Sequence, residues 1–106
     1  MAYKLIRTDK FDEELFDIIC YIASSSGDKN IALNYLDEIE ENAKILETFP
    51  EAGSQPRSSI LRKQGYRAFV LAKNHIAFYK INKEKKEVVL YHIVDDRRNY
   101  IKLIRD

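Results

Sequence analysis

The stretch FDEELFDIICYIASSSG, residues 11–27, has the spacing of an amphipathic helix. Apolar residues recur every three or four positions, which places them on one side of a helix. They are Phe11, Leu15, Ile18, Ile19 and Ile22. Acidic residues fill the first turn, where they stabilise a helix N-terminus, and a serine run with Gly27 ends the pattern. The stretch predicts a helix whose apolar side must be covered by the rest of the fold.

A second amphipathic helix follows almost at once. Asp28 is a favourable N-cap, because its carboxylate accepts hydrogen bonds from the free N–H groups of a first turn. Phe49 and Pro50 end this helix, since proline disfavours helical backbone in the residue before it. Its apolar stripe is Ile31, Tyr35, Ile39, Ala43 and Leu46. The two helices, at about residues 9–48, predict a hairpin that needs a sheet to lie on.

The rest of the chain supplies that sheet. Residues 3–7, YKLIR, favour a strand, and three β-rich runs follow at residues 67–71, 76–81 and 88–94. The short connections between these three runs predict antiparallel hairpins. The last run barely alternates apolar with polar residues, as expected for a central strand that is covered on both faces.

Together these elements predict one α+β domain over residues 1–106. The order is strand, helix, helix and three strands, with the hairpin packed on one face of a small, mostly antiparallel sheet. The sheet is expected at about residues 61–95 together with strand 3–7. Residues 97–106 form a C-terminal segment, with a short helix from Arg98 as one option. The basic residues of the second half are expected on the other face of the sheet.

The composition bounds the cell compartment and the class of protein. With 45% hydrophobic and 33% charged residues, the chain has the balance of a globular domain rather than of a disordered one. No apolar run approaches the roughly 20 residues that span a bilayer, and the N-terminus is too polar for a signal peptide. The single cysteine, Cys20, cannot form an internal disulfide and is expected as a small core residue. A cytoplasmic protein is the expectation.

Charge is sorted between the two halves of the chain. Residues 1–53 carry five basic and twelve acidic residues, a net charge of −7, whereas residues 54–106 carry thirteen basic and five acidic residues, a net charge of +8. An acidic face and a basic face are therefore predicted. The basic face suits a polyanion, although an acidic protein would be attracted equally.

Arginine and tyrosine are the residues with chemical potential. His75 and His92 have no partner at metal-ligand spacing, and the chain has no glycine-rich phosphate loop, so no metal or cofactor is expected. Arg67 begins one predicted strand, and Arg97 follows another, two residues before Asn99 and three before Tyr100.

Two interpretations of these residues stay open. If their strands are antiparallel neighbours, Arg67 and Arg97 converge and can hold a phosphate, with Tyr100 positioned for proton transfer. Alternatively, Arg97 and Arg98 pair with the aspartates before them at a surface turn, and Tyr100 packs against a C-terminal helix.

Four segments, taken in order, resemble the RelE/ParE superfamily of toxins from bacterial type II toxin–antitoxin systems. They are LETFPEAG, LRKQGYRAFVL, HIAFYKI and VVLYHIVDDRRNY, and the likeness covers nearly the whole chain. The resemblance implies the same fold as above, a helical hairpin on a small antiparallel sheet. It also implies growth inhibition and a role in plasmid stabilisation.

The superfamily implies two different activities. RelE-like members are mRNA interferases, endoribonucleases that cut mRNA in the ribosome, while ParE-like members bind DNA gyrase without catalysis. The first activity assigns catalysis to Arg67, Arg97 and Tyr100. We expect Arg62, Lys63 and Arg98 to bind the substrate in that case.

The sequence leans slightly to mRNA cleavage but departs from that pattern. Ile60 and Ser58 stand where some ribonuclease members have lysines, and Asn99 stands where others have a histidine. The FPEAG motif and the long hairpin are more typical of ParE. A degenerate toxin fold that serves only as a binding module is a third reading.

The resemblance also implies partners. These are a cognate antitoxin, the ribosome with mRNA or else gyrase, and DNA only through the toxin–antitoxin complex.

Overall fold

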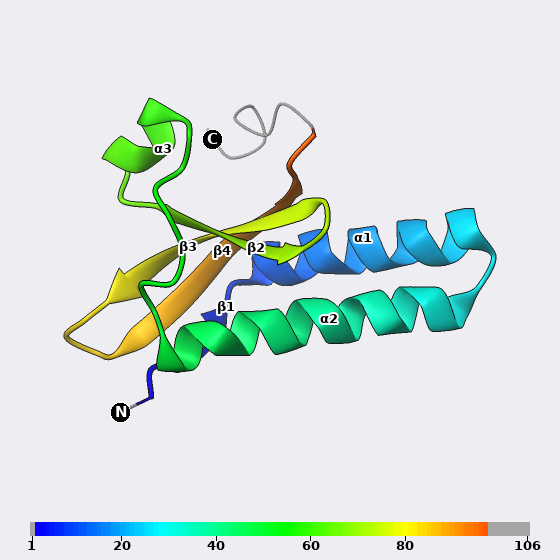
Figure 1. Cartoon of the computed structure of the whole chain (residues 1–106), viewed down its shortest axis with the longest axis horizontal. Coiled ribbons are helices and arrows are strands. Elements are labelled where there is room, and N and C mark those ends of the chain that lie inside the picture. The colour runs from blue at the N-terminus through cyan, green and yellow to red at the C-terminus, as the bar shows by residue number, and fades with distance from the viewer. Residues whose placement is uncertain (1, 98–106) are drawn as a thin grey trace.

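The computed structural model describes residues 2–97 as one helical layer on a four-stranded sheet (Figure 1). The elements in chain order are β1 (Lys4–Arg7), α1 (Asp9–Ser26), α2 (Lys29–Thr48), α3 (Ser59–Lys63), β2 (Arg67–Ala72), β3 (His75–Asn82) and β4 (Glu87–Asp95). The predicted hairpin and strands are confirmed, whereas the short helix α3 is not among the predicted elements. The optional helix from Arg98 lies outside the described residues.

The strands lie in the order β1-β4-β3-β2. β1 pairs with β4 in parallel, and the other two pairings are antiparallel, so the sheet is mostly antiparallel as predicted. β4 lies between β1 and β3, which confirms its predicted central position.

Local sequence sets the ends of the two long helices. The Thr8 hydroxyl accepts the Phe11 N–H at 3.1 Å and caps α1. Gly27 ends α1 with a φ of 68°, a left-handed conformation that glycine adopts without steric cost. Asp28 caps α2 as predicted, because its carboxylate accepts the Asn30 N–H at 2.8 Å.

The main core lies between the hairpin and the sheet. α1 contributes Phe11 and Leu15, and α2 contributes Ile39 and Leu46, all of them buried against strand residues such as Leu90. A smaller cluster lies on the opposite face of the sheet, where Leu61 of α3 packs with Phe78 and Val94. The sheet is thus covered by the hairpin on one face and in part by α3 on the other.

Two predicted core positions of the hairpin are exposed. Cys20 is exposed because it follows Phe11 by nine residues, or two and a half turns, and so faces the opposite side of α1. Ile31 is 50% exposed. It lies near the start of α2, in the part of the hairpin that projects past the end of the sheet (Figure 1).

The β2 edge of the sheet is partly capped. The backbone of Ser54 exchanges two hydrogen bonds with Ala68, and the Asn42 side-chain amide donates to the Leu71 carbonyl at 2.6 Å. Such caps reduce the edge's capacity to pair with another strand.

Among the described residues, no helix is both long enough and apolar enough to cross a membrane.

Candidate functional site

Arg67 holds the loop between α2 and α3 against the sheet. Its Nη2 donates to the backbone carbonyls of Glu51, at 3.0 Å, and Gly53, at 2.7 Å. Its Nε lies 3.4 Å from the hydroxyl of Tyr79, its partner residue on β3. The guanidinium that the sequence assigns to catalysis is therefore bonded within the protein.

Tyr79 completes the same network from the buried side. Its side chain is fully buried, and its hydroxyl donates to the Pro50 carbonyl at 2.7 Å and accepts the Gly53 N–H at 3.0 Å. We call Arg67, Tyr79 and the backbone groups they bind at residues 50–53 the Arg67–Tyr79 cluster.

Gly53 is required by the closeness of this packing. A Cβ at this position would lie 2.5 Å from the Ala68 carbonyl oxygen and 2.6 Å from the Tyr79 hydroxyl. Atoms do not approach so closely without displacement, and the Ala68 oxygen belongs to the backbone of a strand. The glycine of the FPEAG motif is thus explained by the fit of the loop against the sheet.

Arg97 forms a surface ion pair instead. Its Nε and Nη2 donate to the two carboxylate oxygens of Asp95 at 3.0 and 2.7 Å, and its backbone N–H donates to the same carboxylate at 2.9 Å. These hydrogen bonds hold the pKa of Asp95 well below its usual range and raise the pKa of Arg97. The surface-turn interpretation is confirmed for Arg97.

The condition for a convergence of Arg67 and Arg97, that their strands are antiparallel neighbours, is not met. The two strands run parallel and are separated by β3. Arg67 pairs with Tyr79, which pairs with Leu90. Leu90 precedes Asp95 by five residues, or roughly 17 Å of strand. The two arginines therefore belong to different ends of the sheet, and their catalytic role stays a prediction without shared geometry.

Of the other assigned residues, the structure describes Arg62 and Lys63, and neither extends a common site with Arg67 or Arg97. Nη1 of Arg62 donates to the carbonyls of Pro56 and Arg57 at 2.7 and 2.8 Å, which fixes the loop before α3. Lys63 is exposed in the last turn of α3. Arg98 and Tyr100 lie outside the described residues.

An aromatic cluster beside β3 and β4 was not anticipated from sequence. Tyr66 and Tyr91 contact edge to face, with ring centroids 5.7 Å apart, and the Lys80 ammonium lies 4.6 Å from the first ring and 5.4 Å from the second. These residues come from three segments, and Tyr91 lies where the β3–β4 register shifts. Their meeting depends on strand pairing, for which the sequence carries no local signal.

The two histidines have separate partners. His75 begins β3, and its Nδ1 lies 2.6 Å from the Tyr35 hydroxyl; burial lowers the pKa of His75 and raises that of Tyr35. His92 contacts the Glu14 carboxylate at 3.2 Å. The same carboxylate also accepts a hydrogen bond from the backbone N–H of Ile93. Ile93 lies in the part of β4 that extends past its pairing with β1. Within residues 2–97, no group of three acidic, histidine or cysteine side chains could hold a metal ion.

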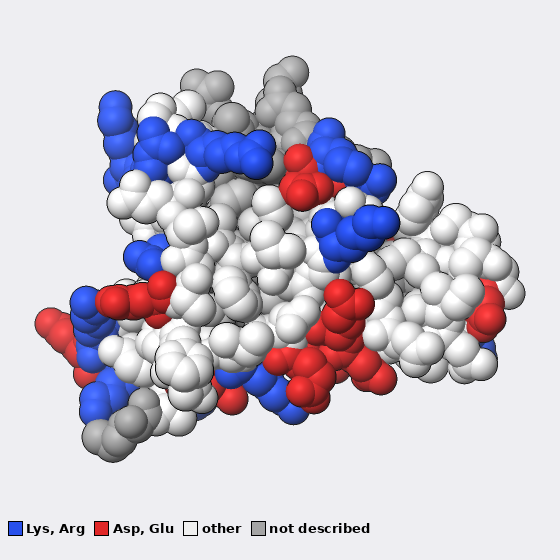
Figure 2. All heavy atoms as spheres, viewed as in Figure 1, with Lys and Arg blue, Asp and Glu red and all other residues white. Residues whose placement is uncertain are grey.

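Figure 2 shows basic and acidic side chains on the same side of the molecule. Basic side chains form a row along the top of the view, from α3 toward the right, and a group of acidic side chains lies lower, over α2. The separate acidic and basic faces stay a prediction.

A family model described as the ParE toxin of the type II toxin–antitoxin system, parDE, matches residues 5–100. No curated protein matches the chain.

Two solved structures share the fold. One belongs to a chromosomal ParDE toxin–antitoxin system from P. aeruginosa, with 22% identity, a TM-score of 0.72, and coverage of 89% of this chain and 96% of that one. The other belongs to the toxin–antitoxin complex RelBE2 from Mycobacterium tuberculosis, with 16% identity, a TM-score of 0.60, and coverage of 90% and 99%.

Proposed function

This chain belongs to the ParE toxin family of type II toxin–antitoxin systems, and we propose that it arrests growth by binding a protein target, DNA gyrase, rather than by cutting mRNA. The family supplies the toxin role, and the choice of target rests on the arginines.

The environment of Arg67 carries this proposal. An mRNA interferase needs cations that are free to hold the phosphate at the point of cleavage. The Arg67 guanidinium already donates to two backbone carbonyls beside the Tyr79 hydroxyl. Turning it toward RNA would leave polar groups of the loop without partners, which is costly where they are partly buried. A structural role for Arg67 fits a toxin that works through its surface.

The remaining residues support the same choice. Arg97 is paired with Asp95 and far along the sheet from Arg67. Ile60 and Ser58 stand where some ribonuclease members have lysines, and Asn99 stands where others have a histidine. A general acid or base is worth roughly 10²–10⁴-fold in rate, so these replacements would remove much of the catalytic capacity.

The same proposal includes a cognate antitoxin as the first partner. Both similar structures come from toxin–antitoxin systems, and a basic surface such as the row over α3 suits an acidic segment that folds as it binds (Figure 2). The toxin would then act in the cytoplasm and would reach DNA only through the antitoxin complex.

Two assays with the purified chain test the target. In the first, gyrase supercoils relaxed plasmid DNA with increasing toxin; in the second, a reconstituted translation system carries a labelled mRNA. We expect supercoiling to be inhibited and the mRNA to stay intact. The Arg97→Ala variant is added to both assays to distinguish gyrase inhibition from mRNA cleavage. Loss of a catalytic arginine would reduce only mRNA cleavage.

Cleavage of the mRNA at ribosome-bound codons, abolished by Arg97→Ala, would contradict the proposal and restore the ribonuclease reading. Activity in neither assay would also contradict it and would leave the fold as a binding module.

A further inference from the structure

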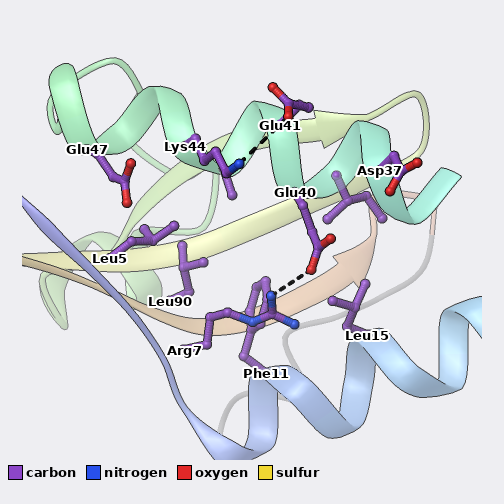
Figure 3. Close-up of a pocket in the computed structure, with 12 residues that line it drawn as sticks. Leu5, Arg7, Phe11, Leu15, Asp37, Glu40, Glu41, Lys44, Glu47 and Leu90 are labelled. Carbon is purple, nitrogen blue, oxygen red and sulfur yellow. Dashed lines mark hydrogen bonds and ion pairs between the residues drawn. The ribbon is translucent and has the colours of Figure 1, made fainter. Parts of the chain in front are cut away.

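A groove runs between α2 on one side and β1 with the start of α1 on the other (Figure 3). Its volume is about 740 Å³. The floor is apolar. Leu15, Ile39 and Leu90 in it are almost fully buried, whereas Leu5 is half-buried. Figure 3 shows Glu40 and Glu47 extending from α2 toward the groove, while Glu41 lies on the other side of α2 beside Lys44.

The rim of the groove is acidic. Asp37, Glu40, Glu41 and Glu47 line it along α2, against two basic residues. Both bases are already paired: Arg7 contacts Asp12 at 2.6 Å and Glu40 at 3.1 Å, and Lys44 lies 3.8 Å from Glu41. Asp37 and Glu47 form no ion pair among the described residues. The rim therefore keeps a negative charge that a basic segment would balance.

The groove also exposes an open strand edge. β1 is at the end of the sheet, and its bonds to β4 include those from the N–H groups of Lys4 and Thr8. Because parallel pairing uses alternate residues, the backbone groups of Leu5 and Arg7 face away from β4. The caps that cover the β2 edge have no counterpart at Leu5 and Arg7 among the contacts of the described residues.

The C-terminal segment of the chain has the matching chemistry. Residues 98–106, RNYIKLIRD, contain three basic residues and one acidic residue, with aliphatic residues between them. Within one molecule the groove is hard to reach. Leu90 in its floor precedes Arg97 by seven residues, roughly 23 Å of strand. At that end of the sheet, Tyr35 of α2 contacts His75 of β3, the residue that pairs with Asp95 of β4.

We propose that this groove binds residues 98–106 of a second copy of the chain. Basic side chains of the segment contact the acidic rim of α2, and its aliphatic side chains lie on the apolar floor. Self-association of this kind goes beyond the proposed target and does not depend on it, since the groove and the segment are properties of the free toxin.

Sedimentation velocity of the purified full chain tests the proposal. We expect the average mass to rise with concentration and to fall as NaCl increases from about 0.05 M to about 0.5 M, because salt screens the contact. Reversing the charge of the rim with Asp37→Lys and Glu47→Lys should weaken association at least about tenfold. Reversing the segment with Lys102→Glu and Arg105→Glu should do the same, and combining all four changes should restore association.

A matched control carries the same change of charge elsewhere. Asp17 and Glu84 are exposed and lie outside the groove, so Asp17→Lys with Glu84→Lys should leave association unchanged. A monomer at all concentrations, or association that the rim changes do not weaken, would overturn the proposal.

A second measurement covers the case in which the rim variant does not fold. The peptide RNYIKLIRD is titrated into the wild-type chain, and NMR follows the methyl groups of Leu5 and Leu90. We expect both signals to shift, and a peptide with glutamate in place of Lys102 and Arg105 to shift neither. Unchanged methyl signals with the first peptide would overturn the proposal and leave the groove to another partner, the antitoxin included.

Discussion

Arg67 and Arg97 are the same residue type with the same predicted role, yet their surroundings differ completely. Arg67 donates to two backbone carbonyls and lies against a fully buried tyrosine. Arg97 is 67% exposed and pairs with a single carboxylate two residues away. The difference indicates that an arginine in a family motif can support the fold through its contacts, whereas an arginine at a surface turn contributes less to stability.

The largest expected effect in this comparison comes from Gly53→Ala in the Arg67–Tyr79 cluster. The added methyl group would overlap the Ala68 carbonyl oxygen and the Tyr79 hydroxyl, so the loop must move away from the sheet. We expect a loss of about 3 kcal/mol in the free energy of unfolding, as for an overpacked core site. Urea denaturation followed by circular dichroism measures this. Gly65→Ala is the control; because its φ of 87° costs strain but nothing lies within 4 Å, its loss should be smaller.

Arg67→Ala should follow, with a loss of about 2 kcal/mol, because it leaves the carbonyls of Glu51 and Gly53 without their charged donor. Arg57→Ala is the matched control, since Arg57 is exposed and its side chain forms no hydrogen bond or ion pair among the described residues. Equal stability of the two variants in urea would mean that the Arg67–Tyr79 cluster contributes nothing.

Arg97→Ala should have a smaller effect than either change in the cluster. The ion pair it removes is on the surface, where water and salt compete with it. The unfolding midpoint in urea should fall only slightly, and the fall should shrink at high salt. A loss as large as that of Arg67→Ala would show that the turn after β4 supports the fold.

The smallest effect concerns pH. The folded-state pKa of Asp95 is lowered by Arg97, so its contribution is present above the unfolded pKa of about 3.9 and is lost as the pH falls through the folded value. The stability difference between wild type and Arg97→Ala should therefore be present at about pH 7 and narrow below about pH 4. Denaturation at both pH values checks this, and a gap that widens in acid would refute the assignment.

Local sequence signals were enough for the elements of the fold. The periodicity from Phe11, the cap at Asp28 and the stop at Pro50 placed the hairpin within a few residues of α1 and α2. These signals act between near neighbours in the chain, so they can be read without knowing the topology. The order of the strands is a property of the whole fold, and this order places Arg67 and Arg97 far from each other.

The candidate site was less predictable for the same reason. Arg67 meets Tyr79 and the FPEAG loop only because three segments pack together, and no spacing in the sequence shows that the guanidinium donates inward. The groove beside Arg7 likewise depends on the open edge of β1. Cys20 is a different case, because its exposed position follows from the helical angle to Phe11 and could have been predicted.

Pulse labelling after induction of the chain in a bacterial host tests the central claim most directly. The account predicts that thymidine incorporation falls first, because the proposed target is DNA gyrase and DNA synthesis depends on it. Methionine incorporation falling first, with transcripts cut at ribosome-occupied codons, would contradict it and make the ribonuclease reading the better one.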